Sequence, residues 1–136
     1  MQRDIKFRGK SKNTGKWIIS KTFVTVSEKI MMGVLSKQDG SLIFEEIDQN
    51  TFGQFTGLYD KHGQEIYEGD LIKFENILKV VYFEEKTAQF KSIFVEFCNR
   101  QNLHGYSSSM DKEYTCGYYE KIGNIFDNSD ILKRLL

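Results

Sequence analysis

The sequence has no proline and only two cysteines among its 136 residues. Without proline, the turns must be built from glycine, asparagine and aspartate, and glycine occurs 11 times. These residues reach left-handed backbone angles at low cost, so the composition favours β-hairpins. The cysteines, Cys98 and Cys116, form no C-x-x-C redox motif. In a reducing compartment we expect both to stay free thiols.

Long apolar runs and net charge are also lacking. The longest apolar run, Ile30 to Leu35, is far shorter than a membrane span, and the charged start of the chain lacks the apolar core of a secretory signal. We therefore expect a soluble cytoplasmic protein with no membrane association. Basic and acidic residues number 19 each, so no overall field draws the chain onto nucleic acid. Since no linker, repeat or low-complexity segment divides the sequence, we predict a single domain over residues 1–136.

Most segments alternate between apolar and polar residues, which is the pattern of half-buried strands. The run Ile77 to Phe83 is apolar on both faces apart from Lys79, which predicts a central strand. Lys29 to Leu35 is ambiguous. The segments predicted to be extended are residues 5–8, 17–19, 22–26, 42–47, 71–75, 77–83, 89–97 and 114–122.

Two segments are predicted not to be strands. Residues 99–112 are polar and contain three consecutive serines, which is typical of a long loop. Residues 131–136 have an apolar helical face and can be capped by Asn128 or Ser129. We predict an all-β (mainly β) fold, either a small barrel or packed antiparallel sheets, with a short C-terminal helix.

The stretch GQFTGLYDKHGQEIYEGDLIKF, residues 53–74, is rich in turn-forming residues. Asp60 and Gly63 occupy the first and fourth positions of a predicted type I turn, which leaves His62 at an exposed tip. A second bend at residues 68–70 precedes the next strand. The polar residues of this stretch therefore look first like turn chemistry.

The same stretch closely resembles the hallmark of the YopX family of phage and prophage proteins. That hallmark has the form G-Q-[YF]-T-G-L-x-D-[KR]-x-G-x-x-[IV]-[YF]-E-G-D-[IL]-[IV], and the run of matches is too long for a chance pattern. The matching residues are Gly53, Gln54, Thr56, Gly57, Leu58, Asp60, Lys61, Gly63, Ile66, Tyr67, Glu68, Gly69 and Asp70.

Both ends of the chain agree with this resemblance. Residues 4–8, DIKFR, are similar to the family's opening, and residues 120–128, EKIGNIFDN, to its closing motif. This chain departs at Ser129, where the family commonly has proline; both residues are tolerated at a helix start. The resemblance implies a phage-encoded or prophage-encoded, mainly β protein of the host cytoplasm. It carries over no catalytic or ligand residue.

The residues themselves give no enzyme signature. No spacing fixes a catalytic triad or a nucleophile elbow. A metal site of Cys98, His104 and Cys116 would have three ligands with no short paired spacing, so we predict neither a metal nor a cofactor. Glu65, Glu68 and Asp70 could bind a cation, but turn shaping and solvation explain them better.

Two binding functions remain open. The first is a non-enzymatic protein-interaction or accessory module, either a homo-oligomer or a partner of an unknown phage or host protein, because residues 77–83 and 89–97 offer surplus apolar surface. The alternative is a small nucleic-acid-binding barrel, since 14% of the residues are aromatic; an aromatic surface bordered by basic residues 8, 10, 12 and 16 would favour it. If the exposed hallmark turn binds a partner, the candidate residues are Asp60, Lys61, His62, Glu65 and Asp70.

Overall fold

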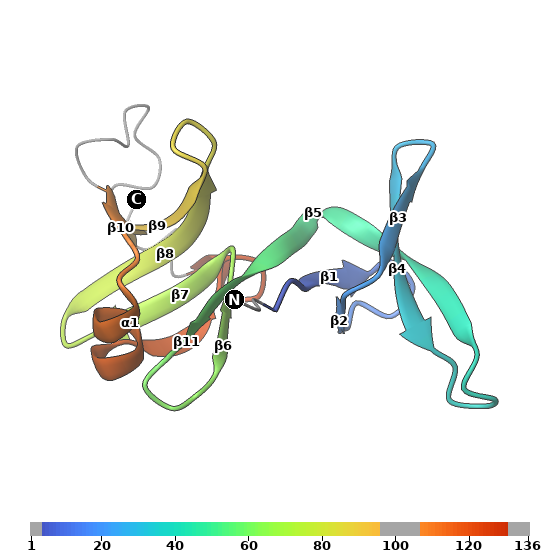
Figure 1. Ribbon diagram of the computed structural model, residues 1–136, viewed down its shortest axis with the longest axis horizontal. Coiled ribbons are helices and arrows are strands. Elements are labelled where there is room, and N and C mark those ends of the chain that lie inside the picture. Colours follow the sequence, from blue (N-terminus) through green and yellow to red (C-terminus); the bar gives the residue numbers. More distant parts are fainter. Residues whose placement is uncertain (1–3, 96–106, 131–136) are drawn as a thin grey trace. The chain divides into compact units, whose positions relative to one another are not determined.

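The computed structural model describes residues 4–95 and 107–130 of the chain (Figure 1). Contacts between Cα atoms divide the chain into two compact units, Met1–Phe55 and Thr56–Leu136. The boundary between the units falls within a single long strand. That the chain forms one domain over residues 1–136 stays a prediction.

The first unit is built on an antiparallel sheet with strand order β2-β1-β5-β4-β3. Register changes once, between Arg8 and Lys10, where β1 pairs with β5. Lys29 to Leu35, ambiguous in the sequence, is a strand. The strands are β1 (Phe7–Ser11), β2 (Trp17–Ser20), β3 (Phe23–Val26), β4 (Lys29–Leu35) and β5 (Leu42–Tyr59).

Aromatic and aliphatic side chains fill one face of this sheet. The rings of Phe7, Phe23 and Phe52 contact one another, with centroids 4.8 to 5.2 Å apart. Met32 and Ile47 are fully buried beside them. Gly9 is required here, because a Cβ atom at this position would overlap the Ile47 side chain.

The second unit contains an antiparallel sheet with order β10-β9-β8-β7-β11, and β6 pairs with β5. Its strands are β6 (Glu65–Tyr67), β7 (Asp70–Phe74), β8 (Ile77–Glu84), β9 (Gln89–Phe94), β10 (Ser107–Ser109) and β11 (Glu120–Asn124). Its helix is α1 (Lys112–Tyr118). Strand β8 is central, which confirms the sequence prediction.

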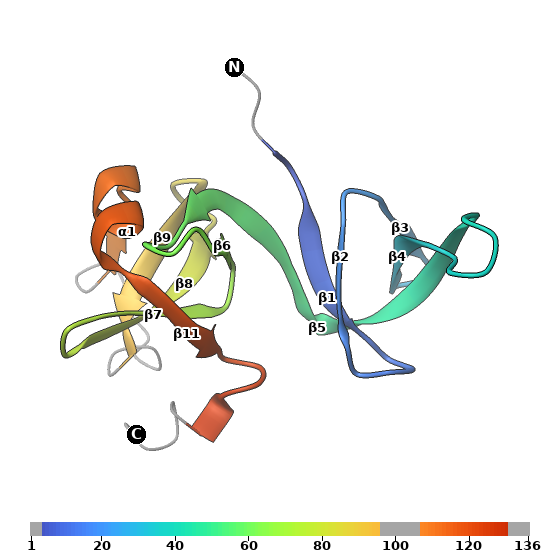
Figure 2. The ribbon, with the colours of Figure 1, turned by 90° about the horizontal axis from the view of Figure 1, so that it is seen from below.

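Both faces of this second sheet are covered. Leu71, Val80 and Ile93 form a cluster on one face. Ile72 and Val81 form a cluster on the other face, against which Met110 and Tyr119 pack from the two ends of α1. The helix therefore lies along one side of the sheet (Figure 2).

The mainly β class with antiparallel sheets is confirmed, and the described strands of neither sheet close into a barrel. Two local predictions were wrong. Tyr114 to Ile122 was expected to be a strand, but its first half belongs to α1 and only residues from Glu120 onward are extended. Ser107 to Ser109, expected in a loop, pair with β9. Backbone at Ser129 and Asp130 is helical, and the rest of the expected C-terminal helix lies outside the described residues.

Candidate functional site

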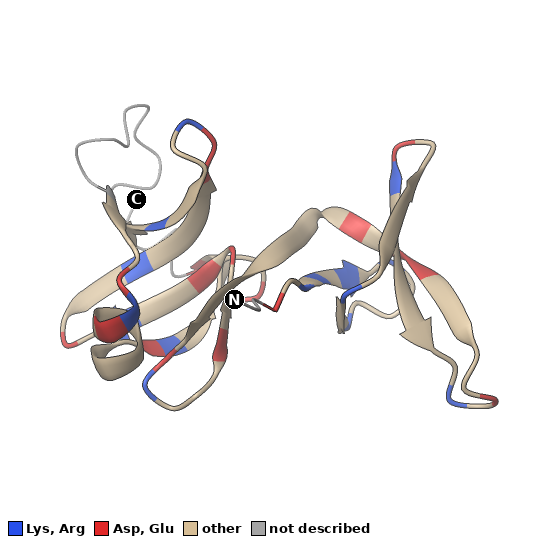
Figure 3. Cartoon of the chain, in the orientation of Figure 1, with Lys and Arg blue, Asp and Glu red and all other residues tan. Residues whose placement is uncertain are grey.

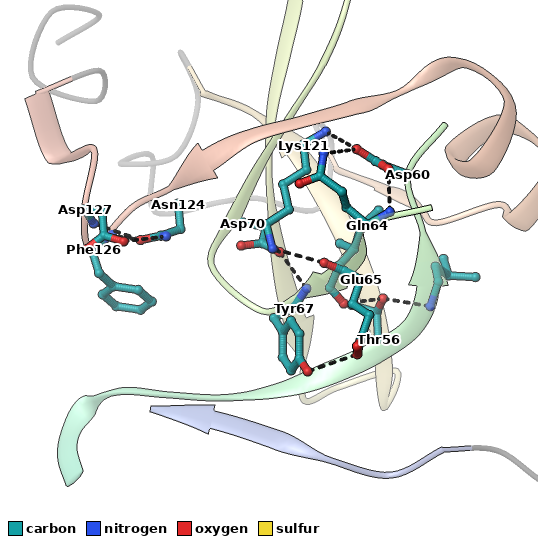
Figure 4. Close-up of polar contacts among 12 residues, drawn as sticks. Thr56, Asp60, Gln64, Glu65, Tyr67, Asp70, Lys121, Asn124, Phe126 and Asp127 are labelled. Carbon is teal, nitrogen blue, oxygen red and sulfur yellow. Dashed lines mark hydrogen bonds and ion pairs between the residues drawn. The ribbon is translucent and has the colours of Figure 1, made fainter. Parts of the chain in front are cut away.

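The hallmark turn after β5 is organised by the carboxylate of Asp60 (Figure 4). Its Oδ1 accepts hydrogen bonds from the backbone N–H groups of His62, at 2.9 Å, and Gln64, at 2.8 Å. Its Oδ2 accepts from the Gln64 side chain at 3.1 Å and from the backbone N–H of Lys121 at 2.9 Å. Asp60 is only 3% exposed, and Gly63 has a φ of 81°. The predicted turn is confirmed.

These contacts set the charge state of Asp60. Burial favours the neutral carboxyl group, but hydrogen bonds from the backbone N–H groups of Lys121, Gln64 and His62 outweigh it and hold the pKa of Asp60 below its ordinary value. The folded unit therefore holds Asp60 as an anion. The three amides come from two segments far apart in the sequence, so this one carboxylate ties β11 to the turn.

Lys121, on β11, connects the turn to the second bend. Its Nζ donates to the backbone carbonyl of Glu65 at 3.0 Å and lies 3.2 Å from Oδ2 of Asp70. That same Oδ2 accepts the backbone N–H of Tyr67 at 2.7 Å. Asp70 is fully buried, and these contacts bring an ammonium group and a backbone N–H to its carboxylate. The Tyr67 hydroxyl donates to the side chain of Glu65 at 3.1 Å.

Gly69, between the two acidic residues of the second bend, is fixed by its backbone and its neighbours. Its φ is 88°, and a Cβ atom built there would lie 2.7 Å from the ring of Phe126. Its N–H donates to the carbonyl of Val81, and its carbonyl accepts from the N–H of Ile125, at 2.8 and 2.9 Å. Only glycine satisfies this angle and this close approach together.

The closing motif uses the same kind of chemistry. The Asn124 side-chain oxygen accepts from the backbone N–H groups of Phe126 and Asp127 at 3.0 and 2.8 Å. The Asn128 side chain in turn accepts from the Asn124 N–H at 3.1 Å. A Cβ atom at Gly123 would overlap the Asn128 side chain. Hallmark and closing motif are therefore adjacent parts of one hydrogen-bonded structure (Figure 4).

The five residues predicted from the sequence divide into two groups. Asp60 and Asp70 are buried and hold backbone amides, while Glu65 is half-buried. Lys61 and His62 present their side chains to solvent, and His62 Nε2 lies 3.6 Å from a Glu120 carboxylate oxygen. A binding role for the five stays a prediction. Sequence reasoning missed Lys121; its place beside Ile122-Gly123-Asn124 in the closing motif was the available signal.

Within residues 4–95 and 107–130, no group of three histidine, cysteine or acidic side chains is arranged to hold a metal ion. Of the residues considered for such a site, Cys98 and His104 lie outside the described residues, and Cys116 on α1 carries a free thiol. The helical parts that the structure describes include none long and apolar enough to cross a membrane.

Exposed apolar side chains gather on one face of the sheet in the first unit, and Lys29 and Glu46 are the charged residues on the same face. Cross-strand register places Val24 beside Met31, Gly33 beside Phe44, and Leu35 beside Leu42. These residues share the sheet face opposite Met32 and Ile47. We call this surface the β3–β5 apolar face; its exposed residues are Val24 (42%), Val26 (55%), Leu35 (71%), Leu42 (54%) and Phe44 (39%).

The surplus apolar surface was expected elsewhere, on the strands at residues 77–83 and 89–97. In the described parts of those strands, Phe83 is the only large apolar residue with a strongly exposed side chain. Five of the others, Leu78, Val80, Val81, Tyr82 and Ile93, belong to the two clusters of the second sheet or pack against them. The expectation of surplus apolar surface on these strands is therefore not met in their described parts.

Comparisons with known proteins identify a family for the sequence and a solved structure with a similar fold. No curated protein matches the sequence. Among solved structures, the crystal structure of protein EF1440 from Enterococcus faecalis superposes with a TM-score of 0.60 at 19% sequence identity. The match covers 96% of this chain and 99% of that one, and it shows a shared fold. The sequence profile of the YopX protein family matches residues 6–133, and the chain belongs to this family.

Proposed function

We propose that the chain is a phage-encoded or prophage-encoded, non-enzymatic interaction module of the host cytoplasm, and that its β3–β5 apolar face binds a second copy of the same chain. The observation that supports the proposal is the exposure of several large apolar side chains on one face of three paired strands, with only Lys29 and Glu46 as charged residues among them. Single exposed apolar residues are ordinary on a protein surface, whereas several gathered on one face favour a contact surface.

Strand β3 supports the choice of partner. It is the edge of its sheet and has the sequence FVTV, without charge or proline. Natural edge strands are protected against pairing by short length, charges, prolines or bulges, and of these β3 has only its short length of 4 residues. Antiparallel pairing of β3 with β3 of a second copy would satisfy its outer backbone groups. It would also join two apolar faces into one buried surface around a two-fold axis.

Nucleic acid binding is less well supported by the described residues. Lysine, arginine and acidic residues are interspersed along the strands (Figure 3). Strand β1 does carry basic residues next to Trp17: Arg8 and Lys10 lie 4.5 and 5.4 Å from its ring centroid. Arg8, however, is 4% exposed, and the two cations occupy the ring that a base would stack on. We therefore keep nucleic acid as the alternative.

Light scattering coupled to size exclusion tests the proposal. We expect the wild-type protein to form a dimer whose proportion rises with protein concentration. The single variants Val24→Asp and Val26→Asp each place a charge on the β3–β5 apolar face. Each should be a monomer. Ile5→Asp is the matched control, because Ile5 is 51% exposed in the same unit but lies outside the strands.

A wild-type monomer at all concentrations would contradict self-association. The same experiment with a mixed oligonucleotide pool at low and moderate salt tests the alternative. A shift onto oligonucleotide that is lost as salt rises would favour phosphate-driven binding.

A further inference from the structure

A second candidate site, independent of the apolar face, lies in the second unit. A pocket of about 240 Å³ is bounded on one side by the sheet and on the other by α1 and its flanking residues. Ile72, Lys79 and Ser92 line it from β7, β8 and β9, with Ser108 from β10. Its remaining lining residues are Ser109, Met110, Asp111, Tyr114, Thr115 and Tyr119.

The strand register determines which side chains of the sheet line the pocket. Ile72 pairs with Lys79, and Lys79 with Phe94. One step along the sheet, Val81 pairs with Ser92, and Ser92 with Ser108. Side chains directly opposite each other in a sheet share a face. The face that α1 covers is thus apolar at Ile72 and Val81, but it carries a lysine and two serines toward β10.

Among the described residues that line this pocket, Lys79 is the one cation, and it is half-buried. Its Nζ donates to the Ser108 hydroxyl at 3.0 Å and lies 5.0 Å and 5.9 Å from the ring centroids of Phe94 and Tyr119. These contacts hold the ammonium group in place but supply no negative charge. Burial lowers the pKa of Lys79, because an ammonium group that loses water is less stable in its charged form.

The carboxylate in the pocket lining is committed to the backbone. Oδ1 of Asp111 caps α1 by accepting from the N–H groups of Glu113 and Tyr114, at 2.8 and 3.2 Å. No ion pair joins Asp111 to Lys79 within these described residues. Hydroxyl groups make up much of the rest of the lining. Lys79 donates to the Ser108 oxygen, so the Ser108 hydroxyl proton remains able to donate to a ligand.

We propose that this pocket binds the oxyanion group of a small molecule, a phosphate monoester or a carboxylate, with Lys79 as its counter-ion and the Ser108 hydroxyl as a donor. A charge-assisted hydrogen bond from the ammonium group is the strongest contact the pocket offers. The volume lies below the range of about 300–1,000 Å³ typical of drug-sized ligands, so the ligand is a small one. Tyr114, at the rim, is 65% exposed and offers its ring to the ligand's body.

Titration of the protein with small anions, monitored through its backbone amide NMR signals, tests the proposal. Methyl phosphate and sodium acetate are added separately to the full chain at constant ionic strength, with sodium chloride as reference. We expect saturable shifts at Ser92, Ser108 and Thr115 for one or both anions and none for chloride. The two arms distinguish a phosphate from a carboxylate ligand.

Lys79→Gln should weaken this binding roughly tenfold or more, because it removes the charge from the strongest contact. Lys73→Gln is the matched control: Lys73 is exposed, lies on the neighbouring strand β7 and is adjacent to Ile72, so it points to the other face. It should leave the affinity unchanged. If Lys79→Gln does not fold, Ser108→Ala, at an exposed position, should still weaken binding several-fold.

The proposal is overturned if the wild-type amides around the pocket do not shift with either anion. It is equally overturned if the shifts are spread over surface lysines and persist in Lys79→Gln, since that result means nonspecific ionic contact.

Discussion

At the scale of single residues, the motif that identifies the family consists largely of residues that fix the backbone. Asp60 holds amides from two segments, Asp70 holds the Tyr67 amide and the Lys121 ammonium group, and Gly69 occupies a left-handed angle against an aromatic ring. When a buried acceptor is removed, its donors stay buried without a hydrogen bond. The resulting loss of folding free energy exceeds the net contribution of the bond itself. Such residues can specify a fold through the backbone groups that they bind.

Asp60→Asn tests this role. An amide side chain offers one acceptor oxygen in place of two, so at pH 7 we expect the free energy of unfolding to fall by about 1–3 kcal/mol. The pKa of Asp60 is lower in the folded protein, so its stabilisation is full above the ordinary aspartate pKa of about 3.9 and is lost as pH falls through the folded value. The difference between wild type and variant should therefore shrink below about pH 4.

Chemical denaturation from pH 7 to pH 2 measures that difference. Asp39→Asn is the control, because Asp39 also has a lowered pKa, from the Ser41 hydroxyl and amide, but is exposed. A wild-type protein no more stable than Asp60→Asn at pH 7 would show that the turn does not depend on the carboxylate.

At the scale of elements, the sequence predicted hairpins better than it predicted the helix. Alternation indicated β7, the apolar run from Ile77 to Phe83 indicated β8, and the Asp60 turn followed from residue types alone. Helix α1 was missed because its sequence, KEYTCGY, contains tyrosine, threonine, cysteine and glycine, which are weak helix formers. Its helical state depends on the Asp111 cap and on burial of Thr115, neither of which alternation reveals.

The hairpin between β3 and β4 allows a prediction at this scale. Val26 pairs with Lys29, so Ser27 and Glu28 form a two-residue turn, and their φ angles are 48° and 68°. Positive φ at both positions defines a type I′ turn, in which asparagine and glycine are preferred. Glu28→Gly should raise the free energy of unfolding by about 1 kcal/mol, because it removes the cost of a left-handed angle at a residue with a Cβ.

Thermal or denaturant unfolding detects this gain, with Glu28→Ala as the comparison, since alanine removes the charge but keeps the Cβ. An equal gain from alanine would assign the effect to charge rather than to backbone strain.

At the scale of the whole molecule, the sequence supplied the family, whereas the surfaces came from the structure. The hallmark and closing motifs led to the YopX family, which the profile match over residues 6–133 confirms. The β3–β5 apolar face could not be located from alternation, because a strand with valine on one face and phenylalanine on the other looks buried on both. Only the register and the exposure of each side chain decide which face is covered.

Amide hydrogen exchange as a function of protein concentration tests the central claim most directly. We predict that backbone amides of β3, residues 23–26, exchange more slowly as concentration rises, because pairing with a second copy protects the edge strand. The amides of the hallmark turn, residues 60–64, should not change. If β3 exchange is independent of concentration while the hallmark turn becomes protected, the contact surface lies at the turn and the proposed assignment is wrong.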